Sequence, residues 1–362
     1  MSILKKVNVY RRIITKGLTK NIGRSHYNQI IDSNQKVEIK KVLISRPNHR
    51  LGNLLLITPL VQDVQATFPD CKIDLFVKGG LAPFIFQNYA NIDSIIELPK
   101  KPFENLMAYF KVWVKIKSAK YDIVINVNKN SSSGRLSAQF ADAKYKFFGE
   151  EDSTLRVKYE DYSHIGKYPV YEFRNFLTKL GFPHNTNTIP SLDLKLSSIE
   201  LSKGKNILAQ IVPDRKKTIA IFTFATDDKC YSTDWWEEFY AALLNEFPDY
   251  NIIEVLPVEN VSQIGFKAPT FYSKDIREIG AVIANTEIFI GADSGIMHLA
   301  SGSLTPTVGL FSRLNQSTYA PYNNNSTGIN TNSSSTTDSI TVIRNILKLR
   351  SLCKTIDGTA NN

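Results

Sequence analysis

Short apolar runs alternate along the chain with longer segments in which apolar residues recur at helical spacing. The runs Lys41–Ser45, Thr218–Thr223 and Thr307–Phe311 are rich in β-branched residues and show no regular polar alternation. Such runs are typical of strands in a parallel sheet, because helices cover both of its faces. The pattern therefore predicts an α/β fold.

The alternation of strand and helix continues through both halves of the chain. In the first half we expect strands at 41–45, 73–77, 94–98, 121–127 and 144–148, and helices at 54–68, 83–88, 103–117, 131–140 and 168–180. In the second half we expect strands at 218–223, 252–256, 288–290 and 307–311, and helices at 233–247, 275–285 and 339–352, with a short helix beginning at Ile296. This alternation predicts two doubly wound, Rossmann-like domains.

The pattern loosens between Phe182 and Asp214, where prolines and a Ser/Lys-rich stretch indicate a linker. The Asn/Ser/Thr-rich stretch 323–337 is typical of a surface loop. We expect five parts: a basic N-terminal arm (1–37), a first Rossmann-like domain (38–182), a linker (183–214), a second Rossmann-like domain (215–337), and a C-terminal helix and tail (338–362).

Composition excludes several classes of protein. With 362 residues, of which 43% are hydrophobic and 22% charged, the chain has a globular composition and the length of two domains. No run approaches the roughly 18 apolar residues of a membrane span, and the amino terminus lacks the apolar core of a secretory signal. The three cysteines are scattered, which fits a reducing cytoplasm.

The formal net charge of +10 is concentrated near the amino terminus. Basic residues in 1–25 are interleaved with apolar ones, and no acid occurs before Asp32. A basic amphipathic helix favours the surface of an anionic membrane. A solvated arm is the alternative interpretation, whereas nucleic acid is disfavoured because no recognised binding module accompanies the charge.

The stretch Glu287–Phe311 (EIFIGADSGIMHLASGSLTPTVGLF) combines a strand, a turn of small residues, a short helix and a second strand. The turn falls at the carboxyl edge of the predicted sheet, where the helix start offers unpaired N–H groups and a partial positive charge to a phosphate. Asp293 adds an acceptor there, and His298 adds a donor whose charge switches near neutral pH. Helix capping by Asp or Ser beside a packed histidine is the structural alternative.

Two motifs resemble glycosyltransferase family 9, the ADP-heptose:lipopolysaccharide heptosyltransferases. Asp293–Phe311 (DSGIMHLASGSLTPTVGLF) is similar to the family pattern D-[ST]-G-x-x-H-x-A followed by P-T-x-x-[LI]-[FY]. Arg50–Leu60 (RLGNLLLITPL) is similar to the amino-terminal pattern R-[LI]-G-D-x-[LV]-x-T-x-P. The resemblance covers roughly residues 40–322. It implies a GT-B fold, in which two Rossmann-like domains face one another across a cleft and the final helix often returns to the first domain.

The resemblance assigns the nucleotide-sugar to the second domain. Ser294 and Gly295 would give main-chain N–H groups to the diphosphate, Asp293 would hold sugar hydroxyls, and His298 would complete the pocket. No Asp-x-Asp pair, the usual holder of Mg²⁺ or Mn²⁺ in metal-dependent glycosyltransferases, occurs in the sequence. A metal-free site with a helix amino terminus, a lysine and hydroxyls is therefore favoured, with no cofactor beyond an ADP-linked donor as substrate.

A second block, 222–229, follows a predicted strand and resembles the family's loop that carries a threonine and then a lysine. Thr226 and Lys229 are assigned to phosphate or sugar on this basis, with a solvated loop lysine as the alternative for Lys229. Glu259 is assigned to the ribose or sugar, and Lys274 falls where the family meets the adenine.

The first domain departs from the family at its presumed general base. The family has Asp after the Gly of R-[LI]-G-D, and this chain has Asn53. A carboxamide does not titrate near neutral pH and cannot take a proton from the acceptor; as an N-cap for a helix beginning at Leu54, Asn53 also has a structural interpretation. Three explanations remain: His49 is the base, deprotonation is left to water or the departing phosphate while Asn53 orients the acceptor, or the protein binds a sugar nucleotide without transferring it.

Basic residues near this loop suit an anionic acceptor. Arg46, Arg50 and Arg135 are assigned to phosphorylated or carboxylated saccharides of a lipid-anchored core, and Lys129 is interpreted as solvated. We expect a metal-independent, inverting glycosyltransferase that moves a heptose-like sugar to a lipopolysaccharide core or related glycan, in the cytoplasm or peripherally at the inner face of the inner membrane. The alternatives are a non-catalytic sugar-nucleotide-binding protein and a GT-B-like sugar-nucleotide epimerase.

Overall fold

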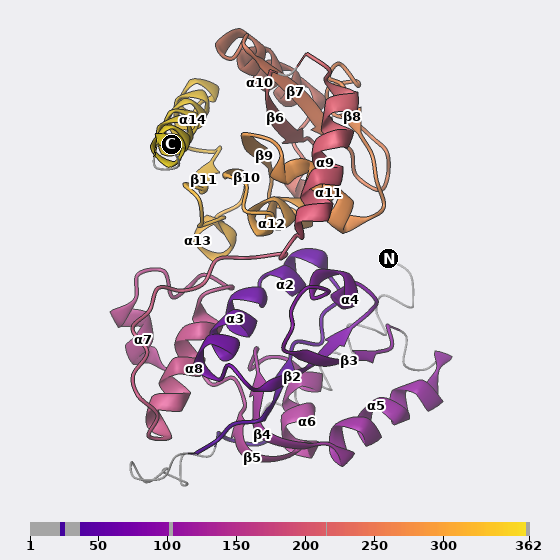
Figure 1. The fold of residues 1–362 in the computed structure, drawn as a ribbon, viewed down its shortest axis with the longest axis vertical. Helices are drawn as coiled ribbons and strands as arrows, with labels where there is room; N and C mark the ends of the chain where they lie inside the picture. The colour runs from indigo at the N-terminus through magenta and orange to yellow at the C-terminus, as the bar shows by residue number, and fades with distance from the viewer. Residues whose placement is uncertain (1–21, 26–36, 101–103, 215, 360–362) are drawn as a thin grey trace. The chain divides into compact units, whose positions relative to one another are not determined.

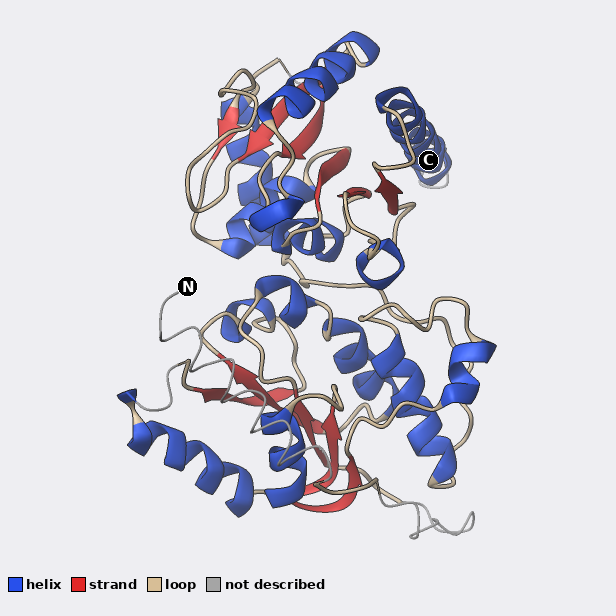
Figure 2. Cartoon of the chain, turned by 180° about the vertical axis from the view of Figure 1, so that it is seen from behind, coloured by secondary structure: helices blue, strands red, loops and turns tan. Residues whose placement is uncertain are grey.

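The computed structural model of the chain describes residues 22–25, 37–100, 104–214 and 216–359, with the side chains of 353–359 left out (Figure 1). The chain divides after Pro190 into two units, and each unit is built around one parallel sheet. Helices cover both faces of each sheet (Figure 2). The predicted α/β class with two parallel sheets is therefore confirmed.

The sheet of the first unit has the order β3-β2-β1-β4-β5. Its strands are β1 (Lys41–Ser45), β2 (Lys72–Lys78), β3 (Ile92–Leu98), β4 (Lys120–Asn126) and β5 (Asp142–Phe147). The chain moves outward from β1 to β3 and then returns to the other side of β1. Loops that leave β1 and β4 therefore diverge at the carboxyl edge, which is where open α/β sheets bind ligands.

The helices of the first unit pack on both faces of this sheet. They are α2 (Leu51–Leu55), α3 (Thr58–Thr67), α4 (Ala82–Ile85), α5 (Leu106–Ser118), α6 (Ser132–Phe140), α7 (Ser153–Lys158) and α8 (Tyr168–Lys179). The single helix predicted at 54–68 is two helices, with Pro59 in the first turn of α3. Proline lacks an N–H and suits a helix start better than an interior, so the break falls just before it.

The sheet of the second unit has the order β11-β10-β9-β6-β7-β8. Its strands are β6 (Lys217–Phe222), β7 (Tyr250–Val255), β8 (Thr270–Phe271), β9 (Ile288–Ala292), β10 (Thr307–Phe311) and β11 (Thr327–Asn330). The order reverses between β6 and β9, which creates a second switch point. The expected loose loop 323–337 contains β11, which pairs in parallel with β10 although only Ile329 supplies an apolar side chain.

The expected linker 183–214 also contains regular structure. Helix α9 (Ser198–Ile211) begins with a capping box of Ser197 and Glu200 and packs against α11 (Ile276–Ala284). Gly204 allows the close approach, since a Cβ there would lie 2.3 Å from the Ala281 carbonyl oxygen. The linker prediction is thus wrong for 198–211. The Ser/Lys-rich sequence of this segment does not indicate helix α9, whose close packing against α11 depends on Gly204.

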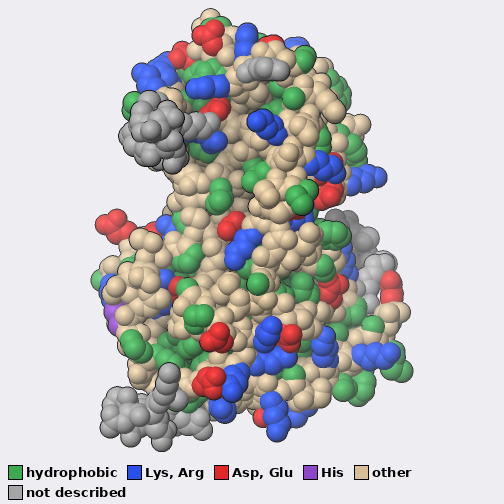
Figure 3. All heavy atoms as spheres, in the orientation of Figure 1, with side chains coloured by type: hydrophobic (Ala, Val, Ile, Leu, Met, Phe, Trp, Pro, Cys, Tyr) green, Lys and Arg blue, Asp and Glu red, His purple; other side chains and the backbone are tan. Residues whose placement is uncertain are grey.

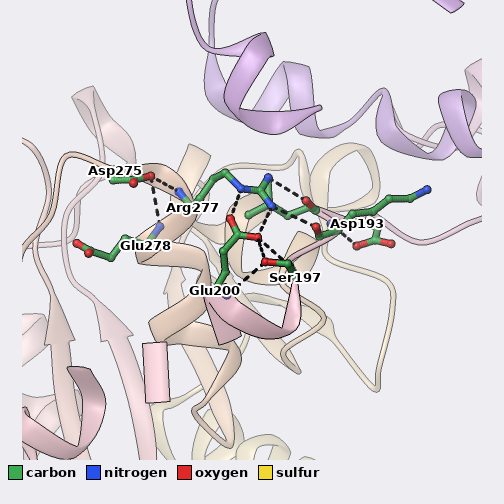
Figure 4. A network of polar contacts seen from close by, with 8 residues as sticks. Asp193, Ser197, Glu200, Asp275, Arg277 and Glu278 are labelled. Carbon is green, nitrogen blue, oxygen red and sulfur yellow. Dashed lines mark hydrogen bonds and ion pairs between the residues drawn. The ribbon is translucent and has the colours of Figure 1, made fainter. Parts of the chain in front are cut away.

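A buried arginine fastens the beginning of the second unit to α11 (Figure 4). Arg277, 4% exposed, donates from Nη1 to the Leu194 carbonyl at 3.1 Å and from Nη2 to the Lys195 carbonyl at 3.1 Å. Its Nη2 also lies 3.0 Å from Glu200 Oε2. Hydrogen bonds from Arg277 hold the pKa of Glu200 down to about 2. The ion pair therefore stays charged over the physiological range.

The last helix belongs to the second unit in its described part. Helix α14 (Thr336–Thr359) lies against α10 (Thr233–Glu246), and its apolar residues Ile340, Ile343, Ile346 and Leu347 join the core of that unit. Arg344 pairs with Glu246 of α10. The family expectation that the final helix returns to the first domain stays a prediction.

The basic arm (1–37) lies outside the described residues except for 22–25 and 37, and residues 22–25 are bound to the rest of the first unit. Arg135 Nη2 donates to the carbonyls of Ile22 and Gly23 at 2.6 and 2.8 Å. Phe148 N donates to Ser25 Oγ at 3.0 Å. Among the residues that the structure describes, no helix combines the length and apolarity needed to cross a bilayer.

Candidate functional site

The donor residues predicted from the sequence gather at the carboxyl edge of the second sheet. The loop 223–229 leaves β6, and Asp293 follows β9, the strand on the other side of the switch point. The two loops meet there: Lys229 Nζ donates to the main-chain oxygen of Asp293 at 2.7 Å and lies 3.4 Å from its Oδ2. Figure 1 shows β6 and β9 within this sheet. The geometry therefore joins the two motifs that the sequence singled out separately.

Asp293 is 8% exposed and its carboxylate is held in place. Asn315 Nδ2 donates to the same Oδ2 at 3.0 Å, from the loop after β10. Within the described part of the chain, Asp293 Oδ1 has no hydrogen bond. Three loops thus orient one carboxylate and leave one of its oxygens to accept hydroxyls.

Helix α12 (Gly295–Gly302) begins directly beside Asp293. Ser294 is its N-cap, and its side-chain oxygen accepts from Met297 N at 3.2 Å. The N–H groups of Gly295 and Ile296 lie in the first turn, before the intrahelical ladder begins, and both residues are partly exposed. A helix start with free N–H groups and a lysine close by forms a site for an anion.

His298 lies in the buried second turn of α12 and is 4% exposed. Burial lowers its pKa to about 4, against the opposing charge of Asp293 and with help from the charge of Lys229. The imidazole is therefore neutral near neutral pH, and the prediction that it switches charge there is wrong. Its ring lies 6.3 Å from that of Tyr319, centroid to centroid.

The other predicted donor residues lie at the same sheet edge but are solvent exposed. Thr226 precedes a turn of 3₁₀ helix at 227–229 after β6, Glu259 follows β7, and Lys274 follows β8. None of these three side chains makes a hydrogen bond or ion pair with another described residue. They are available for a ligand, and nothing in the fold fixes their orientation.

Sequence reasoning missed two features of this edge. Asn315 follows strand β10, so the rule that strand ends carry function would have included it. Glu254, fully buried in β7, accepts from Thr223 Oγ1 at 2.5 Å and from Ser262 Oγ at 2.7 Å. The sequence pattern that could have revealed Glu254 is an acidic residue within an otherwise apolar strand. The contacts tie the loop that carries Glu259 to the end of β6.

The first unit places a second group of predicted residues after β1. Arg46, 7% exposed, donates from Nη2 to Asn53 Oδ1 at 2.9 Å. Asn53 lies inside α2, whose N-cap is Arg50, so the N-cap interpretation of Asn53 is wrong. His49 and Arg50 are exposed in the same loop. The structure therefore brings Arg46 and Asn53 into contact and leaves the other two side chains at the surface.

Arg135 does not belong to this group. Its guanidinium binds the carbonyls of residues 22 and 23 and lies over the Phe148 ring, 5.6 Å from the centroid. We therefore assign it a structural role instead of acceptor binding. Lys129 pairs with Glu151 at 3.0 Å. Across the described residues, no three His, Cys, Asp or Glu side chains cluster in the manner of a metal site.

Comparison with known proteins agrees with the fold and the motifs. Residues 273–343 match the family described as glycosyltransferase family 9 (heptosyltransferase). Lipopolysaccharide heptosyltransferase 3 of Escherichia coli is 23% identical over 299 residues, 76% of this chain and 84% of that protein. Lipopolysaccharide core heptosyltransferase OpsX of Haemophilus influenzae is 23% identical over 291 residues, 76% of this chain and 80% of that protein.

Solved structures show the same architecture. A glycosyl transferase family 9 protein from Veillonella parvula superposes with a TM-score of 0.62 at 18% identity, covering 82% of this chain and 87% of that chain. Escherichia coli heptosyltransferase WaaC with ADP-2-deoxy-2-fluoro heptose gives a TM-score of 0.57 at 15% identity, covering 85% and 99% of the two chains. These neighbours have the GT-B fold of two Rossmann-like domains. In its motifs, its fold and its curated relatives, the chain is similar to glycosyltransferase family 9.

Proposed function

We propose that the protein is a metal-independent, inverting glycosyltransferase that moves a heptose-like sugar from an ADP-linked donor to a lipopolysaccharide core or related lipid-anchored saccharide. The observation that carries the proposal is the meeting of Lys229, Asp293 and the start of α12 at the switch point of the second sheet. The heptosyltransferase relatives, which align over most of the chain, support the sugar and the acceptor class.

The leaving diphosphate must be stabilised by positive charge and by hydrogen-bond donors. An ammonium group offers three N–H donors. Asp293 accepts up to two of the N–H donors of the Lys229 ammonium group, so one N–H donor remains for a phosphate oxygen. The N–H groups of Gly295 and Ile296 complete the site, and charge that develops on the diphosphate during departure strengthens these bonds most.

Asp293 is proposed to hold the sugar. Lys229 and Asn315 both contact its Oδ2 side, which leaves Oδ1 to accept from sugar hydroxyls. His298 is buried and neutral, so it adds no positive charge beside this carboxylate. The carboxylate therefore positions the transferred group, while Lys229 and the helix start bind the group that departs.

The acceptor side lacks a carboxylate base at Asn53. Because Arg46 donates to Asn53 Oδ1, the amide presents its NH₂ group to an acceptor and donates a hydrogen bond. We infer that Asn53 orients the acceptor. The acceptor oxygen attacks C1 from the face opposite the diphosphate as the C1–O bond breaks, and the hydroxyl proton passes to water or to the departing phosphate.

Asn53 also favours a second candidate, a protein that binds a sugar nucleotide without transferring it. Nucleotide release from a panel of sugar nucleotides, measured with core saccharide acceptors present and absent, separates the two. Acceptor-dependent release supports transfer. Binding without release under every condition supports the second candidate and contradicts the first.

Lys229→Gln provides the site test in the same assay. Loss of a charged hydrogen bond of about 1.5–3 kcal/mol predicts roughly a 10- to 100-fold lower kcat/KM. Lys216→Gln is the matched control, because Lys216 is an exposed lysine just before β6, at the opposite edge of the sheet. Equal activity of both variants would contradict the assignment of Lys229.

A further inference from the structure

Helix α5 turns large apolar side chains toward solvent on the first unit. Leu106, Met107 and Phe110 are 63%, 66% and 63% exposed, and Val114 is 47% exposed. Phe140, at the end of α6, is 51% exposed. Isolated apolar side chains at a surface are ordinary, but a contiguous group on one helix marks an interaction surface.

The spacing of these residues makes them one stripe. Leu106, Phe110 and Val114 are four residues apart and share a face, with Met107 beside them. The opposite face of α5 packs inward through the fully buried Ile116. A groove of about 560 Å³ runs along the stripe between α5 and α6, lined by Tyr109, Phe110, Trp113, Val114, Leu136 and Phe140 together with Lys117 and Ser118.

Lysines flank the stripe along α5, and Glu104 is the acid that precedes it in the sequence. Residues 106–120 contain four lysines and neither Asp nor Glu. Lys111 and Lys117 make no ion pair with any described residue, and Lys115 donates to Ser94 Oγ at 2.6 Å. Burial and the nearby charge of Lys117 lower the pKa of Lys146 in β5, although Asp142 opposes this. Figure 3 shows hydrophobic and basic side chains side by side over α5.

We propose that α5 and the adjoining end of α6 form a docking surface for an anionic lipid bilayer. Apolar side chains of this size insert at the boundary of headgroups and acyl chains, and flanking lysines meet lipid phosphates. A second copy of the chain is a poorer occupant, because a twofold contact through this face would set its lysines against those of its partner. The surface would hold the enzyme beside a lipid-anchored acceptor.

This docking is independent of catalysis, so its test and the transfer assay can fail separately. The full chain is sedimented with vesicles of phosphatidylcholine and phosphatidylglycerol at about three to one, and with phosphatidylcholine alone, in about 0.1 M salt. We expect at least tenfold stronger partitioning onto the anionic vesicles. The triple variant Leu106→Gln, Met107→Gln, Phe110→Gln should lose at least tenfold of this binding.

Matched controls use apolar residues exposed elsewhere. Val157 and Ile199 are 90% and 80% exposed and lie outside the stripe, so Val157→Gln with Ile199→Gln should bind vesicles as the parent does. Lys111→Gln with Lys117→Gln should weaken binding to anionic vesicles roughly 30-fold, at about 1 kcal/mol per lysine, and leave binding to neutral vesicles unchanged. In the Phe110→Trp variant, brominated lipid should quench the fluorescence of the introduced indole. This quenching reports insertion into the bilayer and keeps an apolar group at position 110.

Three results would overturn the proposal. Parent-like vesicle binding by the triple variant would assign the binding to another part of the chain, such as residues 1–25. If the fluorescence of the tryptophan introduced by Phe110→Trp is not quenched while the protein is bound to vesicles, α5 lies outside the bilayer. A change of oligomeric state in the triple variant, with vesicle binding intact, would make this face a contact between copies of the chain.

Discussion

At the scale of single residues, Asp293 connects the loops of the candidate donor site. Lys229 and Asn315 reach its carboxylate from loops that follow different strands, and α12 begins beside it. The sequence predicted Asp293 and Lys229, because both follow strands in recognisable motifs. It did not predict Asn315, whose contact depends on how the loop after β10 folds back.

Arg46, Arg135 and Asn53 show the limit of residue types as evidence. A sequence does not reveal whether a guanidinium is already bound, and carbonyls of residues 22 and 23 occupy that of Arg135. Arg46 instead approaches Asn53 and fixes which end of its amide faces outward. These roles follow from tertiary contacts that span more than one element.

Restoring the carboxylate at position 53 tests the acceptor side. Asn53→Asp should raise turnover by about tenfold, less than a full general base contributes, because Arg46 favours the ionised carboxylate and weakens it as a base. Asn53→Ala should leave donor affinity unchanged, since the donor residues lie in the second unit. Unchanged turnover in the first variant, or weakened donor binding in the second, would contradict this assignment.

His298 predicts a specific dependence of stability on pH. Its pKa is lowered to about 4 in the folded protein by burial, below the ordinary value of 6.5. Between these values the unfolded state binds the proton and the folded state does not, so stability rises with pH across this window. The protein should lose on the order of 3 kcal/mol from this group as pH falls from 7 to about 4.

The measurement is the thermal midpoint of the parent and of His298→Gln as a function of pH. Carboxylates titrate in both proteins, so the difference between the two curves isolates the histidine. The difference should change steadily through the window and level off above about pH 7. Parallel curves would show that His298 is not buried in its neutral form.

At the scale of elements, strands and long helices were predicted well because both carry strong apolar periodicity. Strand β1 has the bounds expected from its apolar run. The sequence did not predict β11 or α9, because packing overrides composition in both places. Strand β11 lies in an Asn/Ser/Thr-rich segment, and helix α9 lies in an expected linker. One helix became two at Pro59, whose place in a first turn the periodicity alone did not reveal.

Gly204 should be intolerant of a side chain although alanine favours helices. Its Cβ would meet the main chain of Ala281 at 2.3 Å, and a backbone neighbour cannot rotate away. Gly204→Ala should therefore destabilise the protein by about 2 kcal/mol or more, against the gain of up to about 1 kcal/mol from helix propensity. Chemical denaturation measures the free energy of unfolding.

Lys205→Ala is the control for that measurement, because Lys205 is the exposed neighbour of Gly204 in α9. Its effect should stay within about 0.5 kcal/mol. A Gly204→Ala protein as stable as the parent would mean that α9 does not pack against α11 as closely as the structure places it.

At the scale of the whole molecule, the two units share the same relation between strand order and the position of the candidate site residues. A parallel sheet reverses its strand order beside its first strand, and the candidate site residues follow the strands at that point. In the first unit these are Arg46 and Asn53, and in the second Lys229 and Asp293. The division of labour predicted from the sequence, with acceptor residues in one half and donor residues in the other, remains a proposal.

Main-chain N–H groups and Lys229 are proposed to hold the donor diphosphate without a divalent ion. Calorimetric titration of the parent with ADP-heptose, once in excess EDTA and once with Mg²⁺, tests this proposal most directly. We expect dissociation constants that agree within about twofold, and a similar loss of affinity for Lys229→Gln in both buffers. Binding that disappears in EDTA and returns with Mg²⁺ would contradict it.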